Sequence, residues 1–89
     1  MATISGARQL GAVVRAERKR RGWSQVVLAE HSSVSRAWLA RFETGHPAAS
    51  LEPVFRVLTA LELDLSVIKR QVSPAEGDVL AALARQEQR

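Results

Sequence analysis

Signals that start and stop helices recur at short intervals along this chain, and they limit it to a bundle of short helices. Gly22 follows a basic run, a pattern typical of the last turn of a helix and the residue beyond it. Ser24 and Ser35 are each placed to cap the N-terminus of a short helix, and Gly45 marks the end of the second one. The predicted order is helix, glycine turn, short helix, tight turn, short helix, glycine, helix.

Each of these segments carries apolar residues at helical spacing, which predicts one buried face per helix. We expect the first helix to begin near Ser5, and Pro53 to lie in the first turn of the fourth, where proline is tolerated. The expected buried side chains are Leu10, Val13 and Val14 of the first helix, Val27 and Leu28 of the second, Leu39 and Phe42 of the third, and Val54, Phe55, Val57, Leu58 and Leu61 of the fourth. With 89 residues, the chain has room for one small core.

The spacing of apolar residues changes after the fourth helix. Over residues 61–68, Leu61, Leu63, Leu65 and Val67 fall at alternate positions, and this period of two predicts a strand instead of more helix. A single strand in a helical chain has no neighbour in its own chain for its backbone N–H and C=O groups. We therefore expect pairing with the same strand of a second copy, with Leu63, Leu65 and Val67 at the dimer contact.

Basic charge is concentrated in the first half of the chain. Residues 1–45 carry eight basic and three acidic side chains, net +5, whereas residues 46–89 carry five and six, net −1, giving +4 for the whole. A polyanionic partner would therefore bind to the first half of the chain. For the basic run at 18–21 two interpretations stay open, compensation of the helix dipole at a solvated helix end or contact with phosphates.

The composition excludes several classes of site. There is no cysteine, which excludes disulfides and thiolate sites for metals or nucleophilic catalysis. His31 and His46 match no metal-ligand spacing, and the chain has no phosphate-binding glycine loop. No apolar run approaches the roughly 18 residues of a membrane span, and Arg8 and Arg15 interrupt the region where a signal peptide would be apolar. We expect a cytoplasmic protein that is not an enzyme and needs no metal or cofactor.

A set of residues between about 10 and 63 matches a known pattern. It comprises Trp23-Ser24-Gln25, Leu28-Ala29-Glu30, Val34-Ser35-Arg36, Leu39 and Phe42-Glu43-Thr44-Gly45. With these residues the chain resembles the lambda-repressor-like, Cro/C1-type (XRE) helix-turn-helix family. The resemblance implies an all-α, lambda-repressor-like helix-turn-helix domain of four to five helices, with a C-terminal strand pairing in a homodimer. Ser33 departs from the pattern, because the family usually has glycine in that turn, but a serine can adopt a positive φ at modest cost.

The strand that follows, LELDLSVIKR, narrows the resemblance to the HipB antitoxins. That resemblance implies a homodimer joined by a small intermolecular sheet, and a toxin partner that is a HipA-type serine/threonine kinase. The expected organisation is a helix-turn-helix DNA-binding domain over residues 1–62, a dimerisation strand over 63–71, and a C-terminal tail or short helix over 72–89.

The third helix is expected to enter the major groove of double-stranded DNA, whose width fits an α-helix. Arg36 is the leading candidate for a base contact, because a guanidinium can donate two hydrogen bonds to one guanine. Trp38 lies off the apolar stripe, and two roles stay open for its indole, contact with DNA or packing against a neighbouring helix. The expected DNA-contacting residues are Ser24, Gln25, Ser35, Arg36, Ala37, Trp38, Arg41, Thr44 and His46.

The resemblance further implies that Arg18 and Glu43 form an ion pair inside the domain, with a structural role. The expected function is a dimeric, sequence-specific repressor that binds an inverted-repeat operator, acts as antitoxin of a HipA-type kinase toxin and regulates its own operon. Two alternatives stay open. One is a stand-alone Cro/C1-type repressor of the kind used in phage or restriction control, and the other is a protein-interaction module without DNA binding.

Overall fold

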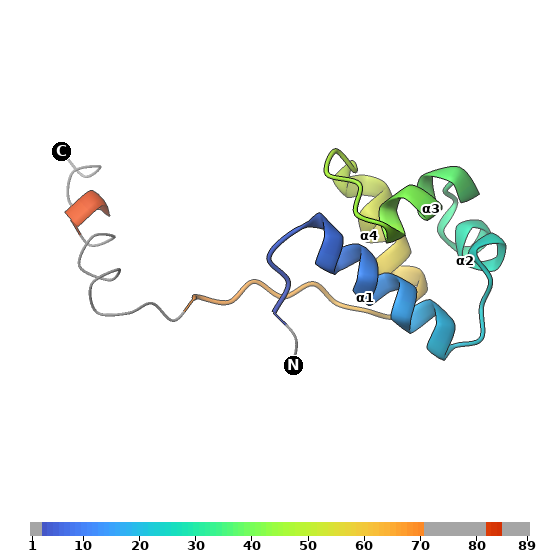
Figure 1. Cartoon of the computed structure of the whole chain (residues 1–89). Coiled ribbons are helices and arrows are strands. Elements are labelled where there is room, and N and C mark those ends of the chain that lie inside the picture. The colour runs from blue at the N-terminus through green and yellow to red at the C-terminus, as the bar shows by residue number, and fades with distance from the viewer. Residues whose placement is uncertain (1–2, 71–81, 85–89) are drawn as a thin grey trace.

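The fold is a bundle of short helices, as the start and stop signals predict. The computed structural model describes residues 3–70 and 82–84. Helix α1 spans Ala7–Arg20, α2 spans Gln25–Ser32, α3 spans Arg36–Glu43 and α4 spans Leu51–Ala60, and residues 82–84 are also helical. In this bundle α1 packs against α3, and α2 packs against both α3 and α4 (Figure 1). The expected all-helical, helix-turn-helix architecture is confirmed.

The core takes one face from each of the four helices. The buried apolar side chains are Val14, Leu28, Ala29, Leu39, Phe42, Val54, Val57, Leu58 and Leu61. The prediction that Phe55 is buried is wrong, because its side chain is 46% exposed. Phe55 lies one helical turn after Leu51, which is also exposed, and both fall on the flank of α4 beside the buried stripe.

Serine caps begin the two short helices at the expected positions. The hydroxyl of Ser24 accepts a hydrogen bond from the N–H of Val27 at 3.1 Å, and the hydroxyl of Ser35 accepts one from the N–H of Trp38 at 3.0 Å. These bonds satisfy backbone donors that a helix leaves free in its first turn. Each short helix therefore has a start fixed by its own sequence.

The first helix begins later than predicted. Its N-cap is Gly6 and not Ser5. The side-chain oxygen of Gln9 accepts hydrogen bonds from both the N–H and the hydroxyl of Ser5, each at 2.8 Å. Ser5 is thereby held outside the helix.

The turn between α2 and α3 is made by a serine in the left-handed region. Ser33 has φ 56 and ψ 42. Its N–H donates to the carbonyl of Glu30 at 3.3 Å, and the N–H of Val34 donates to the carbonyl of Ala29 at 3.1 Å. This is the bond pattern that closes a helix before the chain changes direction. The helix-turn-helix turn thus forms without the glycine that the family usually has there.

The strand expected over 63–71 is not formed in the single chain. Residues 63–70 lie in no helix or strand, and Figure 1 shows this segment running from α4 away from the helical bundle. Leu65, Val67 and Ile68 are 51%, 93% and 79% exposed. In the described part of the chain no second extended segment pairs with this one, so its backbone groups have no ladder partner. Of the tail expected over 72–89, only residues 82–84 are among those described.

Helices α1 and α3 cross at a glycine that no pattern in the sequence marks. Gly11 is buried in α1 against the C-terminal end of α3. A Cβ on Gly11 would overlap the carbonyl oxygen of Phe42 and would lie 3.1 Å from that of Glu43. Only a hydrogen fits at this contact, and the backbones of the two helices approach each other there.

We predict that Gly11→Ala destabilises the protein. In an ordinary helix interior, alanine is more stable than glycine by about 0.5–1 kcal/mol. Here the added methyl group would clash with backbone, and overpacking of this kind costs about 1–3 kcal/mol or more. Urea unfolding measures the difference. The control is Ala12→Gly at the exposed neighbouring position, which should cost about 0.5–1 kcal/mol. A Gly11→Ala protein as stable as wild type would contradict the close crossing.

Candidate nucleic-acid interface

The outer face of α3 carries two arginines whose guanidinium groups have no ion-pair partner in the part of the chain that the structure describes. Arg36, Ala37 and Arg41 are exposed, and their spacing along the helix puts them on one side. Among the described residues, neither arginine has an acidic side chain within ion-pair distance. Their positive charge is therefore available to a ligand without loss of an internal contact.

The N-termini of α2 and α3 add polar groups to this region. Ser24 and Ser35 are exposed, and each hydroxyl accepts a hydrogen bond from its own helix, which leaves the hydroxyl hydrogen to donate elsewhere. The positive ends of the helix dipoles lie at the same places. Gln25 is half-buried, and its amide nitrogen donates to Glu43 Oε1 at 3.2 Å, so this side chain ties α2 to α3.

Thr44 and His46, the remaining two residues expected to contact DNA, lie in the loop after α3. Thr44 is exposed, and its hydroxyl donates to the carbonyls of Ala40 and Arg41, at 3.3 and 3.0 Å, at the end of α3. His46 is half-buried. Gly45, with φ 100, lies so near α1 that a Cβ there would be 3.0 Å from the Cα of Arg8. Arg8 is exposed beside this loop, a position that sequence spacing does not reveal.

One face of the Trp38 indole is covered by other side chains of the domain. Its indole stacks on Phe42, with ring centroids 5.1 Å apart and an interplanar angle of 10°, and it lies against the hydrophobic core. The residue is still partly exposed. Since Phe42 belongs to α3 itself, this stacking leaves both roles of Trp38, contact with DNA and packing against a neighbouring helix, as predictions.

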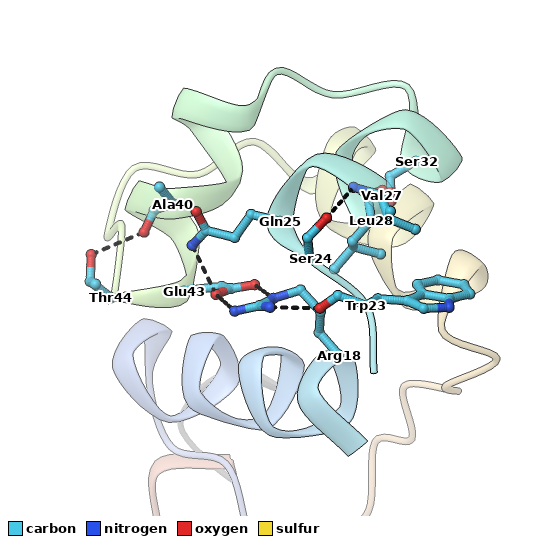
Figure 2. A network of polar contacts seen from close by, with 10 residues as sticks. All are labelled: Arg18, Trp23, Ser24, Gln25, Val27, Leu28, Ser32, Ala40, Glu43 and Thr44. Atoms are coloured by element: carbon cyan, nitrogen blue, oxygen red, sulfur yellow. Dashed lines mark hydrogen bonds and ion pairs between the residues drawn. The ribbon is translucent and has the colours of Figure 1, made fainter. Parts of the chain in front are cut away.

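On the buried side of α3, opposite its exposed arginines, an ion pair joins three helices (Figure 2). Arg18 Nε donates to Glu43 Oε2 at 2.7 Å, and Nη2 donates to Oε1 at 3.0 Å. The remaining nitrogen, Nη1, donates to the carbonyl of Trp23 at 2.8 Å. Hydrogen bonding by Glu43, together with its charge, raises the pKa of the Arg18 guanidinium above its ordinary value. Together with the amide of Gln25, these bonds tie α1, α2 and α3 around one carboxylate.

The other arginines of the basic run are engaged by a second carboxylate. Arg20 Nε donates to Glu17 Oε2 at 2.9 Å, and Arg21 Nε donates to Glu17 Oε1 at 3.3 Å. Hydrogen bonds from Arg20, and then from Arg21, lower the pKa of Glu17 to about 2. In the described structure, Lys19 is the one member of the run without an acidic partner. Most of this run is therefore held by ion pairs within the domain.

No other kind of site stands out in the described residues. Within residues 3–70 and 82–84, no three histidine or acidic side chains gather closely enough to hold a metal ion. None of the helices in those ranges is long and apolar enough to cross a membrane.

A family profile described as a helix-turn-helix domain matches residues 9–71, which is more than half of the chain. Comparison with curated protein sequences finds no match. Among solved structures, a chain of the HipA-HipB-O2-O3 complex matches with TM-score 0.74 and 25% identity, over 80% of this chain and 100% of that one. The HipB-O4 20mer complex gives the same values. The HipB-O1-O2 complex matches with TM-score 0.72 and 26% identity, over 78% of this chain and 100% of that one.

We predict that Arg18→Ala weakens ligand binding by loosening the fold. The substitution leaves the buried carboxylate of Glu43 without its cation, and breaking a buried pair costs about 3–5 kcal/mol. Thermal unfolding should show a large fall in the midpoint. The matched control is Arg20→Ala, which removes the same charge from an exposed pair and should change the midpoint little. An unchanged midpoint with lost binding would mean that Arg18 contacts the ligand itself.

Proposed function

The chain belongs to the Cro/C1-type (XRE) helix-turn-helix family and is HipB-like, and we propose from this that it is a dimeric, sequence-specific transcriptional repressor and antitoxin. The observation that carries the proposal is the exposed face of α3, where Arg36 and Arg41 have no acidic partner in the described structure. A polyanion would compensate these charges, and an α-helix of this kind fits the major groove of double-stranded DNA.

Each residue of the interface has a role in this proposal. Arg36, at the start of α3, donates to a guanine, and Arg41 contacts a phosphate or a base. Ala37 and the exposed part of Trp38 contact the major groove between these two arginines. The hydroxyls of Ser24 and Ser35, the loop residues Thr44 and His46, and the N-terminal end of α2 at Gln25 contact the DNA backbone.

The segment after α4 serves as the dimer contact in this proposal. Residues 63–71 pair with the same residues of a second copy, which gives their backbone groups a ladder and covers Leu63, Leu65 and Val67. The exposure of Leu65 and Val67 in the single chain supports this. Two recognition helices about 34–36 Å apart would contact the two halves of an inverted repeat, and occupancy of that site would block the promoter.

The partner in this proposal is a HipA-type serine/threonine kinase toxin, encoded beside this gene. The match to a chain of a HipA-HipB complex supports it. The antitoxin binds the toxin and represses the shared operon in the cytoplasm, with no catalytic residue, metal or cofactor of its own. A protein-interaction module without DNA binding is disfavoured, because nothing in that role accounts for Arg36 and Arg41, which are exposed on α3 and have no acidic partner among the described residues.

We predict that Arg36→Ala lowers affinity for the operator by about 1–3 kcal/mol and relaxes preference at one base pair. The operator is first selected from a random duplex library, and binding of each variant is then titrated at several salt concentrations. Wild type should lose affinity steeply with salt, because counterions are released from each phosphate that it contacts.

The salt dependence also distinguishes the kinds of contact. Arg36→Ala should leave the slope unchanged if Arg36 contacts a base, whereas a uniform loss over all sequences, with a slope smaller by about 1, would make it a phosphate contact. A wild-type protein with no measurable DNA affinity at low salt would contradict the proposal and favour the interaction module.

We predict that the neighbouring gene encodes a kinase-like chain that copurifies with this protein. The two chains are coexpressed with a tag on this one, and kinase activity is measured for the toxin alone and for the complex. The antitoxin should bind the toxin and suppress its activity. Operator binding without any such partner would favour the stand-alone repressor.

A further inference from the structure

Arg21, the C-cap residue of α1, reaches across the bundle to the exit of α4. Its Nη2 donates to the carbonyl of Leu61 at 2.8 Å, and its Nη1 lies 3.5 Å from Glu62 Oε1. Leu61 is the C-cap of α4, where helix carbonyls lack partners within the helix. Because the carboxylate of Glu62 is 80% exposed, the bond to the Leu61 carbonyl is the stronger of these two contacts.

The same guanidinium is held firmly on its other sides. Arg21 Nε lies 3.3 Å from Glu17 Oε1, and Cζ lies 5.5 Å from the centroid of the Trp23 ring. Trp23 in turn stacks on His31 at the end of α2, with centroids 4.7 Å apart and an interplanar angle of 9°. The side chain of Arg21 is only 23% exposed. Glu17 of α1 and the ring of Trp23, which is itself stacked on α2, therefore hold the guanidinium of Arg21 in place.

The backbone at the exit of α4 makes a sharp turn. Glu62 has φ 55, in the left-handed region. The N–H of Glu62 donates to the carbonyl of Thr59 at 3.0 Å, and the N–H of Leu63 donates to that of Leu58 at 2.8 Å. The orientation of the Leu61 carbonyl at this turn sets the direction in which residues 63–70 leave the bundle.

A small change in that direction has a large effect at the end of the segment. At about 3.3 Å per residue, an extended segment of this length spans roughly 26 Å. A rotation of about 10° at its start would move its end by about 4–5 Å, which exceeds the rise of one base pair, about 3.4 Å. The half-site spacing that a dimer accepts therefore depends on how rigidly this exit is held.

We propose that Arg21 is a positioning residue that fixes the dimerisation segment relative to the recognition helix and so sets the spacing of operator half-sites. The inference rests on the dimer of the proposed function. It needs the planar fork of arginine, which bonds the Leu61 carbonyl and Glu17 together, and a lysine lacks this geometry. Arg20 is the matched control, because it pairs with the same carboxylate but is 68% exposed and, among the described residues, makes no hydrogen bond to the exit of α4.

The first experiment measures spacing preference in the full chain. Operators selected by wild type are remade with the half-sites one or two base pairs closer or farther apart, together with an isolated half-site. Wild type and Arg20→Ala should prefer one spacing by about tenfold per base pair of displacement, the order of one mismatched base pair. Arg21→Ala and Arg21→Lys should bind the half-site as wild type does but accept neighbouring spacings within about threefold, below the effect of a mismatch.

The second experiment measures the geometry without DNA. The chain has no cysteine, so Ala12→Cys on the exposed side of α1 gives one spin-label site per protomer. Pulsed dipolar spectroscopy should show one narrow inter-protomer distance for wild type and Arg20→Ala. The distribution should be broad for Arg21→Ala and Arg21→Lys. If Arg21→Ala does not fold, Arg21→Lys carries the test, because it keeps the positive charge beside Glu17.

Different outcomes would overturn the positioning role of Arg21 and the proposed dimer. Arg21 variants with the wild-type spacing preference and a narrow distance distribution would overturn the positioning role alone. A wild-type chain that shows no dipolar coupling and no preference for inverted repeats would overturn the proposed dimer, and the role of Arg21 with it. A purely structural role would lower the unfolding midpoint of the Arg21 variants without changing spacing preference, and that result too would overturn the inference.

Discussion

The bidentate ion pair between Arg18 and Glu43 is the interaction on which the arrangement of the recognition helix depends. Burial of two charges is costly, and here the cost is offset because all three arginine nitrogens and both carboxylate oxygens have partners. No buried side-chain nitrogen or oxygen in the described residues lacks a hydrogen bond. Directional bonds of this kind fix a crossing angle more sharply than apolar contact does. At the same crossing, Gly11 lets the two helix backbones meet.

Ion pairing also decides how much of the basic charge is available to a ligand. Of the eight basic side chains in residues 1–45, Arg18, Arg20 and Arg21 are engaged by Glu43 and Glu17. Within residues 1–45, the exposed basic residues without an acidic partner in the described structure are Arg8, Arg15, Lys19, Arg36 and Arg41. The density of charge in the sequence therefore overstates the density on the surface, and the run at 18–21 contributes mostly to the stability of the domain.

Local signals in the sequence predicted the helices well, but they could not predict the contacts between helices. The caps at Ser24 and Ser35 involve atoms within three residues, and their effect follows from residue type alone. The exposed positions of α3 follow from helical spacing in the same way. By contrast, the burial of Gly11 depends on α3, and the role of Arg21 depends on α4, forty residues away along the chain. Periodicity also failed for Phe55, because it identifies an apolar face but not where the neighbouring helix stops covering it.

Helix α1 links the parts of the fold that a dimeric DNA-binding protein must hold in register. Near its N-terminus the backbone of Arg8 lies against the loop at Gly45, in its middle Gly11 and Arg18 hold α3, and at its end Arg21 holds the exit of α4. One rigid helix therefore connects the recognition face to the segment that leaves the bundle. Arg8 and Arg15, the exposed arginines of α1 without an acidic partner in the described structure, are not the residues whose side chains bond to α3 or to the exit of α4. The side chains of α1 that hold the fold by hydrogen bonds and those that offer charge to a ligand are therefore different residues. Substitutions along one helix can for this reason separate stability, affinity and spacing.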